Sequence, residues 1–367
     1  MIPYLDLKSI NLAHQEELKT AFDSVLQSGW YIMGKHLEEF EQNYALYNQT
    51  TYSVGVANGL DAIILSLKAL NIGEGDEVIV PSNTYIATWL AVSYVGAIPI
   101  PVEPNWVTCN INPTLIESKI TSKTKAIIPV NLYGQAAEMD KIMALANQYK
   151  LAVVEDNAQA QGALCNGKLA GSFGHLNATS FYPGKNLGAL GDAGAITSND
   201  ESLIKQIKVL RNYGSQVKYY NEVKGVNSRL DELQAALLNI KLKYLPADTE
   251  ERQRLAKIYD EKLEGIEGLT LPHNAENCTS VYHIYQIRTE KRDALQKYLT
   301  EQGIGTVIHY PVPPHLQKAY KELNYQKGDF PIAEKIANET LSIPLYQGMT
   351  EEQQGFVIEK IKTYFEV

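Results

Sequence analysis

The chain is expected to be an α/β protein with a large, mostly parallel sheet and a smaller C-terminal α+β domain. From about residue 50 to 240, short runs that are apolar on both faces alternate with helical segments, as in parallel strands covered by helices on each side. After about residue 245 a charged helical segment precedes a run with alternating polarity. With 367 residues, 45% of them hydrophobic, the chain can form two cores. We therefore expect a large domain over 1–245 and a small domain over 246–367.

The expected elements follow in a regular order. Residues 1 to about 50 have the pattern of amphipathic helix around the turn "SGWYIMG". Parallel strands are expected at 76–82, 97–103, 125–131, 151–157 and 178–183, with helices at 60–70 and 139–149 between some of them. In the second domain we expect a helix at 249–263, a strand at 281–289, a helix at 291–302 and a strand-like segment at 305–311.

Charge and composition argue against several classes of partner. The net charge is −9 and Lys/Arg blocks are short, so a groove that follows a nucleic-acid backbone is not expected. A helix N-terminus can nevertheless hold one phosphate without net positive charge. The N-terminus lacks the pattern of a signal peptide and no 18-residue apolar run occurs, so we expect a cytoplasmic protein without a membrane partner.

The cysteines give no sign of a metal centre or a disulfide framework. Cys109, Cys165 and Cys278 are scattered and odd in number, and no CxxC or Cys/His cluster is present. We therefore expect no bound metal.

The segment "VANGLDAIILSL" contains a possible phosphate site. Asn58 and Gly59 open a helix, which leaves the amides of Gly59, Leu60 and Asp61 free to bind an anion. Taken alone, the segment also fits an ordinary turn with a helix N-cap.

The segment "VVEDNAQAQGA" places acidic residues where a strand ends. A carboxylate such as Asp156 could hold a pyridine nitrogen protonated, because an opposite charge favours the cationic form. Gln159 could then donate a hydrogen bond to a ring oxygen. Helix capping explains the Glu155–Asp156 pair equally well.

The segment "SFYPGKNLGALGDAGAITS" holds one lysine among glycines and small residues. Ser180 ends a strand and Lys185 follows five residues later, with glycines that let the backbone approach a ligand. A lysine amine forms Schiff bases with carbonyl cofactors when burial leaves it partly unprotonated. A solvated surface loop is the alternative.

The order of these features along the chain is more specific than any one of them. A phosphate-binding helix start, a strand-end Asp, a strand-end Ser and a lysine 29 residues after Asp156 are the order expected for a pyridoxal phosphate (PLP) site. Over essentially its whole length the sequence resembles the DegT/StrS family of nucleotide-sugar aminotransferases, which have an aspartate-aminotransferase-like (type I PLP) fold. The matching segments are "SGWYIMGKHLEEFE", "GVANGLDAI", "PSNTYIAT", "VVEDNAQAQGA", "SFYPGKNLGALGDAGAI" and "NSRLDELQAA".

The resemblance implies a role for each matching residue. Lys185 matches the Schiff-base lysine, Asp156 the partner of the pyridinium nitrogen, and Gln159 the residue near the phenolic oxygen. The remaining matches are Tyr85, which would stack on the ring, Ser180 with the amides of Gly59, Leu60 and Asp61, which would hold the phosphate, and Asn227, which would reach the phosphate of the other subunit. The resemblance therefore implies a homodimer with shared sites.

The resemblance also implies a reaction. Glutamate would give its amine to C3 of a dTDP-3-keto-6-deoxyhexose, and the product would be a dTDP-3-amino-3,6-dideoxyhexose of galacto or gluco configuration for surface polysaccharides. A C4 aminotransferase acting on a UDP- or GDP-linked keto sugar and a non-catalytic PLP-binding regulatory protein remain alternatives. Dehydrating relatives carry histidine where this chain has Lys185, which argues against a dehydratase.

Residues that would contact the sugar are less well marked. Tyr182, Tyr213, His309 and Tyr310 lie near the motifs and are candidates. For His309, a structural role is an equally good explanation. We expect His175, His283 and His315 to be structural.

Overall fold

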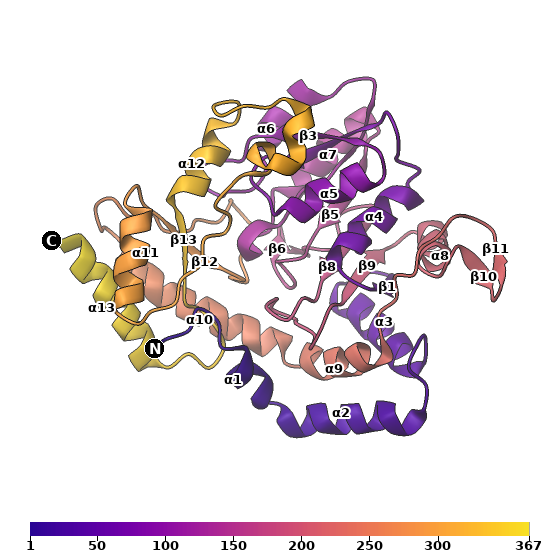
Figure 1. The fold of residues 1–367 in the computed structure, drawn as a ribbon, viewed down its shortest axis with the longest axis horizontal. Helices are drawn as coiled ribbons and strands as arrows, with labels where there is room; N and C mark the ends of the chain where they lie inside the picture. The colour runs from indigo at the N-terminus through magenta and orange to yellow at the C-terminus, as the bar shows by residue number, and fades with distance from the viewer. Residues whose placement is uncertain (367) are drawn as a thin grey trace.

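A seven-stranded sheet forms the centre of the computed structural model, which describes residues 1–366 (Figure 1). Only β9 runs antiparallel to its neighbours, and the other six strands are parallel to one another. The strands lie in the order β1 (Tyr52–Val56), β9 (Gly194–Ser198), β8 (Leu176–Ser180), β5 (Ala152–Asp156), β4 (Thr124–Ile127), β2 (Glu77–Pro81) and β3 (Ile98–Val102). The expected large, mostly parallel sheet is confirmed.

Both faces of this sheet are covered by helices, which explains the continuous apolar runs. In β2, Val78 and Val80 point to one face and Ile79 to the other, and all three are fully buried. The first face is covered by α4 (Gly59–Ala69), α5 (Ile86–Tyr94) and α8 (Glu201–Leu210), and the second by α7 (Met139–Tyr149) and the short α6 (Pro113–Ile116).

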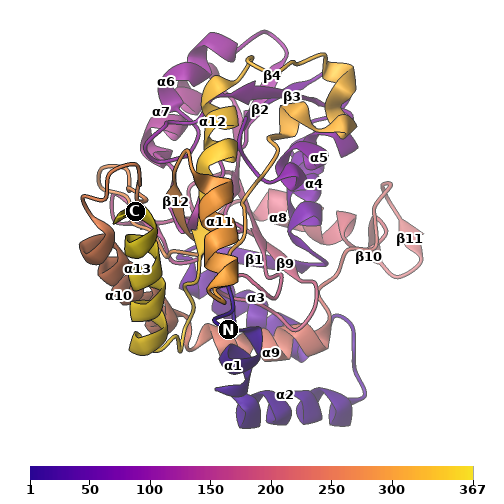
Figure 2. The same ribbon diagram turned by 60° about the vertical axis from the view of Figure 1, so that its left-hand side comes forward.

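A second core belongs to the C-terminal part of the chain. It lies between α10 (Leu245–Leu263), α11 (Arg292–Glu301), α13 (Glu351–Glu366) and the antiparallel pair β12 (Tyr285–Arg288) and β13 (Thr340–Ile343). Figure 2 shows these helices packed side by side at one end of the molecule. The segment expected as a strand at 305–311 makes only one bridge, between Val307 and Ser342, and Pro311, which has no N–H to donate, ends it.

Two segments cross between the parts of the chain. The amide of Ile2 donates to the carbonyl of Gly303 at 2.8 Å, so the N-terminus packs with the C-terminal core. Residues 314–323 form short 3-10 turns, and Tyr320 packs edge-on against Trp89 of α5 at 5.1 Å. α12 (Pro331–Glu339) follows and also contacts the large sheet domain, through Ile336. The division into two domains near residue 245 therefore remains a prediction. The N-terminus and residues 314–339 connect the two main cores.

The remaining elements are short. They are the hairpins β6 (Leu164–Cys165) with β7 (Lys168–Leu169) and β10 (Ser215–Val217) with β11 (Tyr220–Asn221), and 3-10 turns at Glu117–Lys119 and Leu132–Gly134. Within residues 1–366 no helix is long and apolar enough to cross a membrane. The same residues contain no group of three or more His, Cys, Asp and Glu side chains arranged to hold a metal ion.

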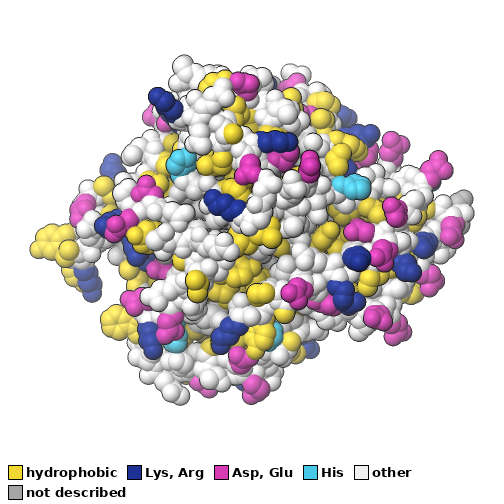
Figure 3. Space-filling model, turned by 180° about the vertical axis from the view of Figure 1, so that it is seen from behind, with side chains coloured by type: hydrophobic (Ala, Val, Ile, Leu, Met, Phe, Trp, Pro, Cys, Tyr) yellow, Lys and Arg dark blue, Asp and Glu magenta, His cyan; other side chains and the backbone are white. Residues whose placement is uncertain are grey.

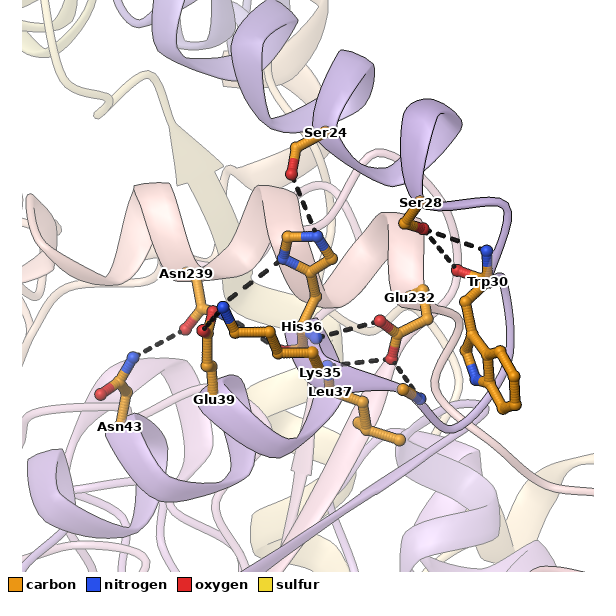
Figure 4. A network of polar contacts seen from close by, with 11 residues as sticks. Ser24, Ser28, Trp30, Lys35, His36, Leu37, Glu39, Asn43, Glu232 and Asn239 are labelled. Atoms are coloured by element: carbon orange, nitrogen blue, oxygen red, sulfur yellow. Dashed lines mark hydrogen bonds and ion pairs between the residues drawn. The ribbon is translucent and has the colours of Figure 1, made fainter.

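A buried carboxylate of α9 caps the third of the N-terminal helices (Figure 4). α1 (Leu7–Leu12), α2 (Gln15–Ser28) and α3 (Lys35–Tyr47) lead into β1, and α2 and α3 pack on α9 (Glu232–Leu242). Glu232, only 1% exposed, accepts hydrogen bonds from the amides of Gly34, His36 and Leu37 at 2.8 to 3.0 Å. These amides open α3 and have no intrahelical acceptor, so the carboxylate caps α3 from another helix.

Replacing Glu232 should therefore destabilise the protein. In Glu232→Ala the three amides lose their acceptor, and we expect a loss of about 2–4 kcal/mol in the free energy of unfolding, measured by denaturant titration. The matched control is Glu39→Gln in the same network, where an exposed carboxylate pairs with Lys35 at 3.5 Å. Its effect should stay within about 0.5 kcal/mol. Equal losses in the two variants would contradict the role assigned to Glu232.

Candidate active site

A cavity of about 660 Å³ lies where the parallel strands end, between the sheet and the C-terminal core. Ligands of open α/β sheets bind at this edge because the loops there can carry polar groups without interrupting the sheet. The wall is formed by the ends of β5 and β8, the starts of α4 and α5, the loop with Lys185, and parts of the C-terminal unit. Of the candidate residues, the cavity is lined by Gly59, Leu60, Tyr85, Asp156, Gln159, Ser180, Tyr182, Lys185, His309 and Tyr310.

One end of the cavity is suited to an anion. The Asn58 side chain caps α4 by accepting from the amide of Asp61 at 2.9 Å, so of the three candidate amides those of Gly59 and Leu60 are left facing the cavity. Asp61 itself does not line the cavity. A Cβ on Gly59 would lie 2.6 Å from Cβ of Ser180, so only glycine lets the helix start meet the end of β8. The Ser180 hydroxyl and a positive helix end thus share one corner.

Asp156 supplies the negative charge of the site. Its carboxylate is buried, with Oδ1 accepting from the Ala158 amide at 3.1 Å and Oδ2 from the Thr88 hydroxyl at 2.9 Å. Burial raises the pKa of Asp156, whereas these hydrogen bonds and the charge of Lys185 act in the opposite direction. A second cation placed beside this carboxylate would stabilise its ionised form further.

Lys185 supplies an amine that is easily deprotonated. Burial lowers its pKa to about 8, although the nearby Asp156 carboxylate partly opposes this effect. About a tenth of such an amine is neutral at pH 7, several hundred times more than for a lysine in water. The structure thus meets the condition set by the sequence for a nucleophilic lysine.

Gln159 is fixed by contacts at both ends of its amide. Its Oε1 accepts from the Tyr133 amide at 2.7 Å and its Nε2 donates to the Tyr310 hydroxyl at 3.1 Å. The Tyr133 hydroxyl in turn donates to the His309 carbonyl. The ring of Tyr85 lies 5.1 Å from that of Tyr310 and is half exposed in the cavity. An aromatic ligand could therefore stack on Tyr85 beside the Gln159 amide.

Besides Asp61, two predicted site residues, Tyr213 and Asn227, do not line this cavity. Tyr213 is 52% exposed at the base of the β10–β11 hairpin, where Arg229 lies over its ring. Asn227 is also exposed and forms a bridge with Asn212. A substrate contact by Tyr213 therefore stays a prediction that the cavity of one subunit does not support, and Asn227 was expected to act in the other subunit.

Among the residues at the cavity that were not predicted as site residues, three stand out. Thr88 supports Asp156, and the N-terminal Tyr4 reaches the cavity, with its ring 5.6 Å from that of His309. His283, expected to be structural, also lines the cavity; burial and the charge of Lys185 lower its pKa. Thr88 could have been found from the sequence, because it lies one helical turn after Tyr85 and therefore on the same side of α5. No sequence pattern links Tyr4 or His283 to the sheet.

The donor set fits pyridoxal phosphate. The corner of Gly59, Leu60 and Ser180 suits its phosphate, the Asp156 carboxylate its ring nitrogen and the Gln159 amide its phenolic oxygen. The Gly59–Ser180 contact, which any larger residue would block, keeps that corner open to an anion. Lys185 lines the same cavity and can reach a carbonyl carbon held there.

The lowered pKa of Lys185 leads to a test on protein freed of cofactor. Because the pKa is lowered to about 8, the neutral amine accumulates as the pH rises through 8, and the rate of pyridoxal phosphate capture should rise and level off near that pH. Stopped-flow absorbance across pH 6–10 measures this rate. Lys185→Ala should bind the ligand without the visible absorbance of a lysine adduct. A rate that still climbs steeply beyond pH 9 would refute the lowered pKa.

Comparison with known proteins places this geometry in a family. Residues 13–362 match the model of the DegT/DnrJ/EryC1/StrS aminotransferase family. The chain is 52% identical over 366 residues to the dTDP-3-amino-3,6-dideoxy-alpha-D-galactopyranose transaminase of Aneurinibacillus thermoaerophilus, covering 99% of each chain. It is 48% identical to the erythromycin biosynthesis sensory transduction protein EryC1 of Saccharopolyspora erythraea, covering 98% of this chain and 99% of that one.

Solved structures agree in fold. DesV of S. venezuelae superposes with a TM-score of 0.98 at 46% identity, covering 100% of this chain and 99% of that one. NtdA of Bacillus subtilis, solved with bound cofactor PMP, superposes with a TM-score of 0.93 at 34% identity, covering 100% and 85%. The aspartate-aminotransferase-like α/β fold and pyridoxal phosphate as cofactor are thereby confirmed, and this chain belongs to the DegT/DnrJ/EryC1/StrS aminotransferase family.

Proposed function

We propose that the protein transfers the amine of glutamate to C3 of a dTDP-3-keto-6-deoxyhexose, giving a dTDP-3-amino-3,6-dideoxyhexose. The observation that carries this proposal is the single cavity in which Lys185, Asp156 and Gln159 meet beside an anion-binding corner. The choice of sugar rests on the full-length, 52% identical relative, whose name specifies a 3-amino-3,6-dideoxy galactose product. We include in the proposal a cytoplasmic location and a role in surface polysaccharide biosynthesis.

Within this proposal, named residues hold the cofactor. The amides of Gly59 and Leu60 with the Ser180 hydroxyl bind its phosphate, Asp156 pairs with its ring nitrogen, Gln159 donates to its ring oxygen and Tyr85 covers one face of the ring. When bound, pyridoxal phosphate supplies an electron sink for negative charge on the carbon that gains or loses the amine. The buried Asp156 carboxylate, fixed by Thr88 and Ala158, cannot swing away from its partner.

Lys185 acts as the proton carrier in both halves of the reaction. Its Nζ has a pKa near 8, so it can accept a proton and return it at neutral pH with little loss of driving force. The Asp156 charge stabilises the protonated form while the carbon is deprotonated.

Residues on the C-terminal side of the cavity are proposed to select the sugar. Burial and the Lys185 charge lower the pKa of His309 to about 4, so its ring is neutral at pH 7. Its Nδ1 lies 2.9 Å from Oγ of Ser342, which leaves Nε2 as the polar atom for a sugar hydroxyl. Tyr182, which is 59% exposed, and Tyr310 complete the proposed sugar contacts.

We also propose that the protein is a homodimer in which each subunit completes the site of the other. Large apolar side chains are exposed on α2 and the turn after it and on the β10–β11 hairpin; they include Phe22, Leu26, Trp30, Tyr31, Tyr219 and Tyr220. Figure 3 shows exposed hydrophobic side chains among charges of both signs on one face of the described residues. Sedimentation should show a dimer at micromolar concentration, and a fully active monomer would refute shared sites.

A regulatory role without turnover is the second candidate, because one relative is named as a sensory transduction protein. A sensor has no need of an amine that titrates near neutral pH, whereas proton transfer requires one. Glutamate alone discriminates between the two: an enzyme converts the aldehyde form of its cofactor to the amine form, with a change in visible absorbance. A glutamate-insensitive spectrum would favour the regulatory reading.

The substrate is tested with a panel of dTDP-3-keto, dTDP-4-keto and UDP-4-keto sugars in the presence of glutamate. We expect turnover with the dTDP-3-keto-6-deoxyhexoses, and NMR of the product should place nitrogen on C3. Faster turnover with a 4-keto sugar would replace the proposal by the C4 alternative.

His309 tests the division between chemistry and sugar selection. Because a misplaced substrate loses rate steeply, His309→Ala should lower kcat/KM for the keto sugar by about tenfold to a hundredfold. The glutamate half-reaction, followed separately by cofactor absorbance, should change by less than about threefold, since glutamate lacks the sugar. Equal slowing of both halves would show that His309 only supports the cavity wall.

A further inference from the structure

Two cysteines that are far apart in the sequence meet outside the cavity. Cys165 ends β6 and Cys278 lies in the loop before β12, 113 residues later, yet their Sγ atoms are 2.8 Å apart. No sequence pattern pairs them, because three scattered cysteines indicate no disulfide framework. Neither thiol takes part in the proposed transamination.

The backbone holds the two residues as a cross-strand pair. The Asn166 amide donates to the Asn277 carbonyl at 2.8 Å and the Thr279 amide to the Leu164 carbonyl at 2.7 Å, so the cysteines between them form an antiparallel, non-hydrogen-bonded pair. Such pairs have Cα atoms about 4.5 Å apart, within the range that a disulfide spans. The Asn166–Gly167 turn, with φ of 48° and 77°, fixes the β6–β7 hairpin in this register.

The surroundings favour an ionised Cys165. Its sulfur accepts from the Cys278 thiol, and this contact is the largest effect on its pKa, which is lowered although burial acts in the opposite direction. The nearby amides of Met139 and Asp140 at the start of α7 lower the pKa further. The carboxylates of Asp140 and Glu138 oppose ionisation of the pair. Cys165 and Cys278 are themselves buried, at 2% and 7% exposed, but their chain neighbours Asn166, Gly167 and Asn277 are exposed. A thiolate beside a second thiol is the arrangement of a reversibly oxidised pair.

We propose that Cys165 and Cys278 are a redox-active dithiol that peroxide converts to a reversible intramolecular disulfide. The Cys165 thiolate attacks one peroxide oxygen, the O–O bond breaks and the leaving hydroxide takes a proton to become water. Cys278 then loses its proton and attacks Sγ of the Cys165 sulfenic acid, expelling a second water. Two thiols are oxidised by two electrons in total, and one peroxide is reduced to two waters.

The disulfide would restrict the motion of the segment between Cys278 and His283, which reaches the cavity. After Cys278 the chain runs through Val281, whose amide donates to the Gly134 carbonyl at 2.9 Å and whose carbonyl accepts from Asn186 at 3.0 Å. Asn186 follows Lys185 directly and also lies 3.3 Å from the His283 ring, which lines the cavity. Oxidation would therefore link the β6–β7 hairpin covalently to the segment before β12, which contains His283.

The test counts thiols on the native, cofactor-loaded protein. Reduced protein is treated with dilute hydrogen peroxide, quenched, unfolded and titrated with a thiol reagent. We expect three thiols per chain before oxidation and one after it, with dithiothreitol restoring three. A non-reducing peptide map should join the Cys165 and Cys278 peptides of one chain. Three surviving thiols, or a map that links Cys109 or two chains, would overturn the proposal.

Single substitutions separate the role of Cys165, which attacks peroxide, from that of Cys278, which then forms the disulfide. Cys165→Ser should lose no thiol to peroxide, whereas Cys278→Ser should lose one, trapped as a sulfenic acid that dimedone labels. Cys109→Ala is the matched control, because Cys109 is fully buried and burial raises its pKa to about 11; it should still lose two thiols. If a variant fails to fold, the wild-type peptide map alone decides.

Oxidised wild-type protein should also melt several degrees higher than reduced protein, because the disulfide restricts the unfolded chain. Equal melting temperatures would refute the proposed restriction of the segment between Cys278 and His283.

Discussion

Burial of the Lys185 amine beside the Asp156 carboxylate is the constraint on which the site depends. Water would hold this lysine protonated, whereas the cavity between the two cores lowers its pKa to about 8. The same burial would raise the pKa of Asp156 further if Thr88, the Ala158 amide and the lysine charge did not oppose it. The same burial thus makes the Lys185 amine easier to deprotonate, while hydrogen bonds and the lysine charge favour the ionised form of Asp156 against burial. An amine that can gain and lose a proton near neutral pH is what proton transfer at a carbon requires.

The cavity that contains Lys185 and Asp156 exists only because the two cores pack against each other. The large sheet supplies Asp156, Ser180 and Lys185, while His309 and Tyr310 come from the C-terminal part. The segments that cross between the parts, including the N-terminus with Tyr4, line or support the same cavity. The hydrogen bonds from Tyr133 to Gln159 and to His309 directly connect the part of the cavity proposed for the cofactor to the part proposed for the sugar. A change in how the cores pack would therefore alter chemistry and selection together.

Close backbone packing requires glycine both at the corner formed by Gly59, Leu60 and Ser180 and at the start of α3. Gly59 lets the start of α4 meet Ser180, and a Cβ on Gly194 would lie 2.5 Å from the backbone of Asn58, the residue that caps α4. At the base, Gly34 leaves room for Trp30 and for the Glu232 carboxylate that caps α3. Close backbone contacts thus explain why glycine stands at positions 34, 59 and 194.

The sequence by itself determined the sheet and most of the cofactor set. Strands buried on both faces show as uninterrupted apolar runs, and groups that bind at strand ends follow those runs directly, so Asp156, Ser180 and Lys185 were visible as local patterns. The tertiary structure decided what depends on contacts between distant segments. Thr88 beneath Asp156, Tyr4 and His283 in the cavity wall, Glu232 as the cap of α3 and the Cys165–Cys278 pair all arise from such contacts. No periodicity or spacing records which distant segments meet, because that is fixed by how the two cores pack and not by any local preference of the chain.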